Sequence, residues 1–152
     1  MYEEDGRHRE AAEYAERSIR DEGLSPFDGF MPYRIWFKAV KALGDEAEMR
    51  RVLEQGIRDF PNMPDFYAEY GVIHYNAERN DEALPYFLQT EEKYNNFEKL
   101  NPREFNRFLH KMPIIYSCIA DIYAEAGDEA KAAAYREKER KAKQPPKAKK
   151  QE

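Results

Sequence analysis

Hydrophobic residues recur at intervals of three and four along most of this chain, which is the spacing that places them on one face of an α-helix. The pattern is clearest in residues 65–87, where Tyr67, Tyr70 and His74 share one predicted helix face. A polar turn at residues 78–81 separates this helix from a second one with the same periodicity. The pattern therefore predicts two helices packed against each other.

Small residues mark the place where these two helices are expected to approach. Gly71 lies on the buried face of the first helix and has no Cβ, so that the second helix can come close there with Ala83, while Phe87 fills the next layer. Asn80 or Asp81 is expected to cap the second helix by accepting hydrogen bonds from its free backbone N–H groups. The sequence thus predicts a tight helical hairpin.

The hairpin pattern repeats along the chain. Gly44 precedes Glu78 by 34 residues within equivalent predicted turns, which gives a first unit over residues 30–63 and a second over residues 64–96. A third unit, residues 113–143, follows after an insertion. The inner-face positions of the first unit are Tyr33, Trp36, Phe37, Val40, Met49, Leu53 and Gly56. Each hairpin would leave an apolar stripe in water unless neighbouring units stack.

Three further segments complete the predicted organisation. Residues 101–111 have the signals of an inserted helix with Asn101 as its N-cap. Residues 1–22 are interpreted as the back half of a repeat with a turn at Gly6, so we expect this chain to be a piece of a longer protein. The basic tail at residues 144–152 is expected to be disordered.

The second unit resembles the tetratricopeptide repeat family, whose pattern is W-x2-L-G-x2-Y followed by A-x3-F. The residues that carry the resemblance are Tyr67, Tyr70, Gly71, His74, Ala83 and Phe87. The resemblance extends over residues 1–143 and implies an all-α fold, a right-handed superhelix of helix–turn–helix hairpins. Residues 2–19 and 119–140 are also similar in texture to the repeat region that follows the catalytic domain in some bacterial family 2 glycosyltransferases.

Composition narrows the function classes. Charged residues make up 36% of the chain, and no apolar run approaches the ~20 residues of a membrane span. No secretory leader follows Met1 and Cys118 is the only cysteine, which together favour a cytoplasmic protein. From Arg136 onwards there are eight Lys or Arg and three Glu, which gives this segment a net charge of +5. Since the whole chain has a net charge of −5, the residues before Arg136 carry −10. An acidic body argues against specific nucleic-acid binding.

Candidate catalytic and metal-binding residues are sparse. His8, His74 and His110 lie far apart, and His74 replaces a packing Tyr of the repeat, so that a core position is favoured over a ligand. Cys118 has no activating partner near it in sequence. We therefore predict a noncatalytic protein without a metal or other cofactor.

The family resemblance implies a binding groove lined by the first helix of each unit. The groove positions are Arg34, Lys38, Lys41, Glu69, Val72, Tyr75, Asn76 and Asp121, with Met31, Asp65 and Ala68 beside them. Arg34, Lys38 and Lys41 share one helix face and predict an anionic group on the ligand, the alternative being an ordinary solvated face. Glu69 argues against a clamp for a chaperone's terminal carboxylate.

The expected function is a protein-interaction scaffold that holds a protein or peptide partner in this groove. The alternative is the C-terminal repeat module of a bacterial glycosyltransferase, serving dimerisation or acceptor binding. Tyr14 and Ile19, on the truncated first repeat, are expected to be exposed, which keeps a homodimer open as a further alternative.

Overall fold

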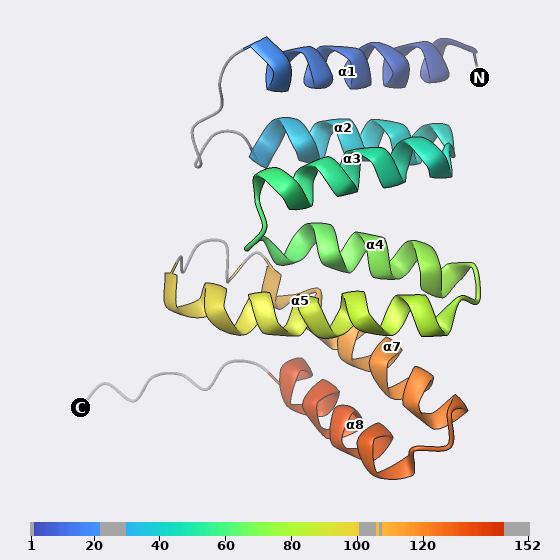
Figure 1. Cartoon of the computed structure of the whole chain (residues 1–152), viewed down its shortest axis with the longest axis vertical. Helices are drawn as coiled ribbons and strands as arrows, with labels where there is room; N and C mark the ends of the chain where they lie inside the picture. The colour runs from blue at the N-terminus through green and yellow to red at the C-terminus, as the bar shows by residue number, and fades with distance from the viewer. Residues whose placement is uncertain (1, 22–29, 101–105, 107, 145–152) are drawn as a thin grey trace. The chain divides into compact units, whose positions relative to one another are not determined.

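The computed structural model describes residues 2–21, 30–100, 106 and 108–144 (Figure 1). These residues form helices joined by turns and contain no strand, which confirms the prediction of an all-α chain for them. They belong to two compact units, Met1–Tyr70 and Gly71–Glu152.

The first unit is built from three helices and the beginning of a fourth. Its helices are α1 (Tyr2–Asp21), α2 (Phe30–Leu43), α3 (Glu46–Asp59) and the first half of α4 (Pro64–Asn76). Gly44 makes the turn between α2 and α3 with a positive φ of 74°, and the Asp45 side chain caps α3 by accepting from the N–H of Glu48 at 3.1 Å. The turn predicted at this position is therefore present.

Aromatic residues form much of the core of the first unit. Tyr33 and Trp36 of α2 are almost fully buried, and the Tyr33 ring lies edge-on to the rings of Phe60 and Phe66 at centroid distances of 5.8 and 5.7 Å. The Tyr33 hydroxyl donates a hydrogen bond to Asp59. Burial, and then this carboxylate, raise the pKa of Tyr33. The inner face predicted for α2 is the buried face.

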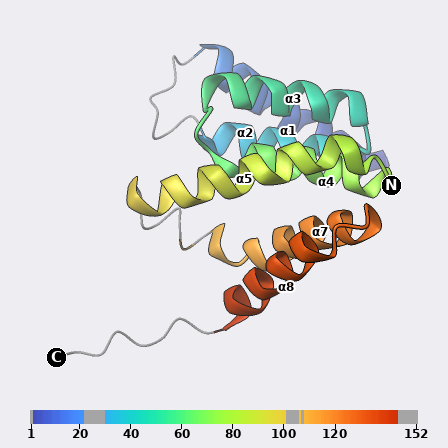
Figure 2. The same cartoon turned by 60° about the horizontal axis from the view of Figure 1, so that its bottom comes forward.

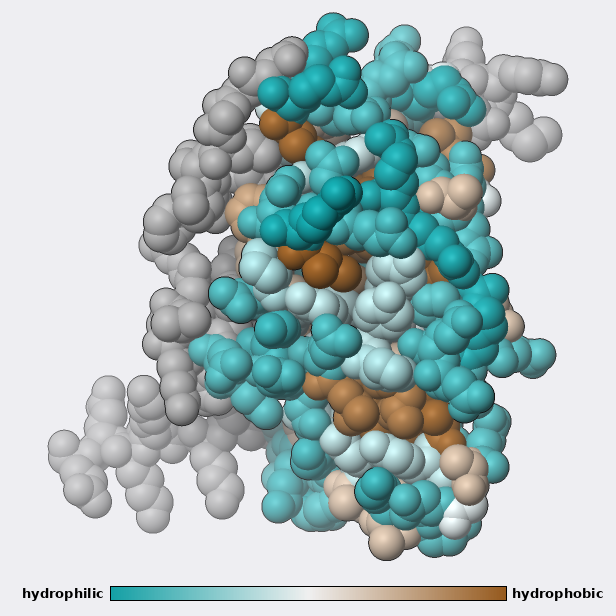
Figure 3. Space-filling model, in the orientation of Figure 1, coloured by the Kyte–Doolittle hydropathy of each residue, from teal (hydrophilic) through white to brown (hydrophobic). Residues whose placement is uncertain are grey.

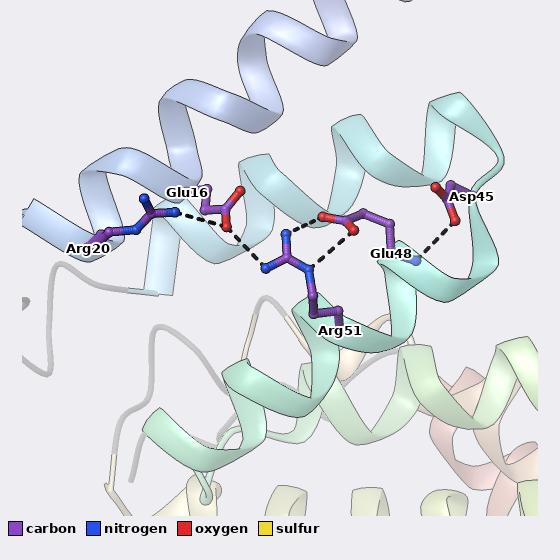
Figure 4. Close-up of polar contacts among 5 residues, drawn as sticks. All are labelled: Glu16, Arg20, Asp45, Glu48 and Arg51. Carbon is purple, nitrogen blue, oxygen red and sulfur yellow. Dashed lines mark hydrogen bonds and ion pairs between the residues drawn. The ribbon is translucent and has the colours of Figure 1, made fainter.

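Charged side chains join α1 to α3 on the outside of this core (Figure 4). Arg51 of α3 donates through Nη1 to Glu16 of α1 at 3.1 Å and through Nε to Glu48 at 3.2 Å. Its guanidinium lies 5.0 Å from the centroid of the Trp36 ring, and Arg20 makes a second ion pair with Glu16. Hydrogen bonds to Glu48 and Glu16 raise the pKa of Arg51, so it stays charged.

The second unit contains the rest of α4 and three further helices. They are α5 (Asn80–Leu100), α7 (Met112–Glu125) and α8 (Glu129–Lys143). The helices α7 and α8 form a hairpin whose two arms lie side by side (Figure 2). Gly127 makes their turn with a φ of 82°, and Asp128 caps α8 by accepting from the N–H of Lys131 at 3.1 Å.

A glycine and an aromatic ring meet on consecutive helices in both units. A Cβ at Gly56 of α3 would lie 2.8 Å from Cε1 of Phe66 on α4, and one at Gly71 of α4 would lie 2.7 Å from Cδ1 of Phe87 on α5. Real Cβ atoms essentially never come so close. The prediction placed Ala83 opposite Gly71; Ala83 is buried, but the ring that fills the space above Gly71 belongs to Phe87.

Three local predictions differ from the structure. Gly6 lies inside the uninterrupted helix α1, so the turn predicted there is wrong. A single Gly in a helix costs only about 1 kcal/mol, and most residues of α1 around it, such as Glu4 and Arg7, are good helix formers. Asn80 and Asp81 lie within α5 rather than at its cap, because the backbone carbonyl of Arg79 already accepts from Glu82 and Ala83. The helix α5 also continues beyond residue 96, to Leu100.

Other predictions fall on residues outside the described ones, among them the N-cap Asn101 and the tail after Gln144. Hydrophilic side chains cover most of the face in Figure 3, with hydrophobic ones in separate patches between them. Within the described ranges, no helix is long and apolar enough to cross a membrane. Tyr14 is 72% exposed, as predicted, whereas Ile19 is half-buried.

Candidate functional site

The outer face of α2 is the most distinctive surface among the described residues of the first unit. The helical period that buries Tyr33, Trp36 and Val40 places the residues on the opposite side of the helix at the surface. Two large apolar side chains are among them, Met31 at 52% and Ile35 at 47% exposure. The residues that make up this outer face of α2 are Met31, Arg34, Ile35, Lys38 and Lys41, all exposed.

Their spacing places apolar and cationic side chains next to one another. Met31, Arg34, Ile35 and Lys38 follow at three, four and seven residues, which is one continuous stripe on a helix. The Arg34 guanidinium lies 4.0 Å from the sulfur of Met31. A partner on this stripe would therefore meet hydrophobic contacts and positive charge together.

Lys41, at the end of the stripe, is partly neutralised within the protein. Its Nζ lies 3.8 Å from Oε2 of Glu69 on α4, and both side chains are accessible to solvent. An ion pair this exposed contributes little to stability and exchanges readily with water. Two residues predicted for the groove, Lys41 and Glu69, are thus brought together.

Sequence reasoning selected the cations of this face but missed Ile35. Ile35 lies four residues after Met31, so its position on the same stripe was readable from the sequence. It was assigned neither to the inner face nor to the groove of the first unit. The structure leaves nearly half of it exposed.

The remaining predicted groove residues lie in the second unit. Val72 is half-buried and Asn76 is exposed at the end of α4. The Tyr75 hydroxyl donates to Oδ2 of Asp121 on α7 at 3.1 Å, and Asp121 also pairs with Arg136 of α8. Burial, and then the bond to Asp121, raise the pKa of Tyr75 to about 12. Tyr75, Asp121 and Arg136 therefore hold α4, α7 and α8 together within the second unit.

Two neighbouring predictions are corrected. Asp65 and Ala68 are only 6% and 5% exposed, so neither lines a surface groove. Asp65 lies in the first turn of α4, where a carboxylate is stabilised by the helix dipole. The helical spacing of Asp65 matches that of the predicted groove residues, but its side chain is buried at the start of α4.

The candidate catalytic and metal-binding residues included His74 and Cys118. Within the described ranges, no cluster of three or more His, Cys, Asp or Glu is arranged to hold a metal ion. His74 is 4% exposed, its Nδ1 accepts from Nε of Arg79 at 3.0 Å, and its ring stacks on Tyr86. The prediction that His74 is a core residue is confirmed. Cys118 is buried, and burial raises the pKa of its thiol to about 11.

No protein-family model matches the sequence, and no curated protein matches it either.

Proposed function

We propose that this chain is a noncatalytic interaction module of tetratricopeptide type, whose hairpins stack in a right-handed superhelix, and that the outer face of α2 is its contact surface for a partner peptide. The repeat interpretation is supported by the turns: Gly44 and Glu78 lie 34 residues apart and share a positive φ, 74° and 60°. A glycine is found at the corresponding turn before α8 as well. The paired contacts of Gly56 with Phe66 and Gly71 with Phe87 fit the same repeat.

The observation that carries the functional proposal is the exposure of Met31 and Ile35 beside Arg34 and Lys38 on one helix face. Large apolar side chains at a soluble surface mark contact sites when they are grouped. The inner face of the same helix is fully engaged in the core. The outer face is thus presented by a helix whose other side is anchored in the core.

The charge of this face defines the partner. Arg34 and Lys38 favour an acidic segment, and Met31 with Ile35 favours one that carries aliphatic or aromatic side chains between its acidic residues. Electrostatic attraction raises the association rate, whereas the apolar contacts give the complex its lifetime. The partner proposed is an acidic peptide segment with apolar anchors.

The test is binding of a fluorescein-labelled panel of twelve-residue peptides in which Asp or Glu alternates with Leu or Phe, followed by fluorescence anisotropy. Lys38→Glu is expected to weaken binding by about tenfold or more and to flatten its dependence on salt. Ile35→Ala is expected to weaken binding with the salt dependence unchanged. The matched control is Lys141→Glu, the same charge reversal at an exposed position of α8.

A second set of peptides with Lys in place of the acidic residues should not bind. If Lys38→Glu and Lys141→Glu bind the acidic peptides equally well, the outer face of α2 is not the contact surface. If neither peptide set binds the unmodified protein at all, the proposed partner class is wrong.

A further inference from the structure

A half-buried carboxylate lies at the centre of a cluster formed by α5, α7 and α8 in the second unit. The Glu91 side chain of α5 is 13% exposed. Its Oε1 accepts a hydrogen bond from the Tyr135 hydroxyl at 2.7 Å, and its Oε2 accepts one from Lys138 Nζ at 2.7 Å. The two oxygens thus have distinct functions, one fixed by a phenol and one bound to an ammonium group.

The same ammonium group lies over aromatic rings. Lys138 Nζ is 4.4 Å from the centroid of Tyr135 and 6.0 Å from that of Tyr116, within the range of a cation–π interaction. The two rings are 6.1 Å apart and tilted at 47°. The cation is therefore held by a carboxylate and by two tyrosine rings.

The residues around the cation are more buried than the cation itself: Tyr116 is buried and Glu91 and Tyr135 are partly buried, whereas Lys138 is exposed. Tyr116 is 9% exposed, and burial, then the Glu91 carboxylate, raise its pKa to about 12, so its ring stays neutral at any physiological pH. Burial and the bond to Glu91 also raise the pKa of Tyr135. Lys138, in contrast, is 46% exposed and reaches the carboxylate by its flexible stem. Moving it into water would leave a preformed anionic, aromatic site.

We propose that Glu91, Tyr116 and Tyr135 form a binding site for a primary alkylammonium group, the side chain of a partner's lysine, and that Lys138 is its resident occupant. The class of ligand follows from the bond to Oε2, which requires an N–H donor. A quaternary ammonium keeps the charge and the cation–π contact but lacks this donor. A partner's lysine must displace Lys138 in order to bind. The apparent affinity for the partner's lysine is therefore lowered in proportion to the fraction of molecules in which the site is free of Lys138.

The chain provides a matched comparison on the same helix. Lys131 Nζ lies 5.3 Å from the centroid of Tyr123 and 3.7 Å from Oδ2 of Asp128. Asp128 is three times as exposed as Glu91, at 39% against 13%, and is the N-cap of the helix that carries Lys131. Removing Lys131 therefore opens no enclosed site.

The experiment is a titration of Lys138→Ala with n-butylammonium, observed through the NMR resonances of the tyrosine rings. We expect saturable shifts of Tyr116 and Tyr135 with a dissociation constant on the order of 1–10 mM. Tetramethylammonium should bind at least about fivefold more weakly. The unmodified protein should show the same shifts with an affinity lower by about tenfold or more, which tests the site without any substitution.

Two further variants isolate the site. Glu91→Gln combined with Lys138→Ala should abolish the shifts, and Lys131→Ala should bind n-butylammonium no better than the unmodified protein does. Absence of saturable shifts in both Lys138→Ala and the unmodified protein overturns the proposal. Equal affinity for n-butylammonium and tetramethylammonium overturns the assignment to primary ammonium groups.

Discussion

The ring of Phe87 lies against the backbone of Gly71, in the space that any side chain at residue 71 would need. The distance from an added Cβ to Cδ1 and Cε1 of the ring is 2.7 Å in each case. Since Phe87 is fully buried, its ring has no solvent-filled space into which it can move. This contact sets the closest approach of α4 and α5.

Gly71→Ala is accordingly expected to destabilise the protein. Overpacking in a dense core costs about 1–3 kcal/mol, while Ala in place of Gly in a helix contributes about 1 kcal/mol of stability, so a net loss of up to about 2 kcal/mol is expected. Urea unfolding followed by far-UV circular dichroism measures it. Combining the change with Phe87→Leu should recover part of the loss.

The matched control is Gly6→Ala in α1, where an added Cβ meets nothing within 4 Å. There the helix propensity acts alone, and the free energy of unfolding should rise by up to about 1 kcal/mol. Equal effects of the two substitutions would refute the role assigned to the Phe87 ring.

Glu78→Gly is expected to stabilise the protein. Glu78 has a φ of 60°, whereas the turns before α3 and α8 use Gly44 and Gly127 for the same left-handed conformation. A non-glycine residue in this conformation costs about 1–2 kcal/mol, which the substitution removes. Glycine also makes the unfolded chain more flexible, which offsets about half of this, so the free energy of unfolding should rise by about 0.5–1 kcal/mol.

Thermal unfolding measures the effect of Glu78→Gly, with Ala77→Gly as the control one residue earlier. Ala77 does not have a positive φ. Its replacement should only lower the melting temperature. A decrease for Glu78→Gly as large as that for Ala77→Gly would contradict the prediction.

Stability should fall at alkaline pH through Tyr116. Burial raises its pKa from 10.0 to about 12 in the folded protein, so the folded state holds the phenolic proton more tightly than the unfolded state. This contribution is complete below pH 10 and is lost as the pH rises through 12, by at most about 3 kcal/mol. Urea midpoints measured from pH 8 to pH 12 follow the loss, and Tyr116→Phe should show a shallower decline. Parallel curves for the two proteins would exclude Tyr116 as a source.

Cys118 should react slowly with thiol reagents. Its pKa is raised from 9.0 to about 11, chiefly by burial and also by the charge of Asp121. Because the thiolate is the reactive species, its fraction at pH 7.5 is lowered about 100-fold, and burial of the sulfur adds to the protection. Reaction with Ellman's reagent at pH 7.5 should therefore be at least about 100-fold slower in the native protein than in guanidinium chloride. A native rate close to the denatured one would show that the thiol is accessible and ionised.

The helices and their turns were the most predictable part of this molecule, because local chemistry determines them. Gly44 and Gly127 mark turns that only a residue tolerant of positive φ adopts easily. The period of three and four residues identified the buried faces of α2 and α7, where Tyr33, Trp36 and Ile119 lie. Spacing predicted the wrong structure at Gly6, because a glycine can occur in a turn or inside a helix at a cost of about 1 kcal/mol.

Surface properties were less predictable because they depend on residues distant in the sequence. Asp65 and Ala68 belong to the stripe expected to line a groove, yet both are buried. Ile35 was assigned to neither the core nor the groove, and it is exposed on the face that carries Met31. The site around Glu91 could not be found from spacing at all, since Glu91 and Lys138 lie 47 residues apart and meet only after α8 has packed.

The contacts of Gly56 with Phe66 and of Gly71 with Phe87 each join a helix to the next one along the chain. Bringing such partners together closes only a short loop, and the entropy lost on closure grows slowly from a small value. Domains dominated by contacts of this kind have a low contact order and fold in microseconds to milliseconds. Within each unit we therefore expect the hairpins to pair early and fast, so that the order of helices along the sequence also becomes the order in which they assemble.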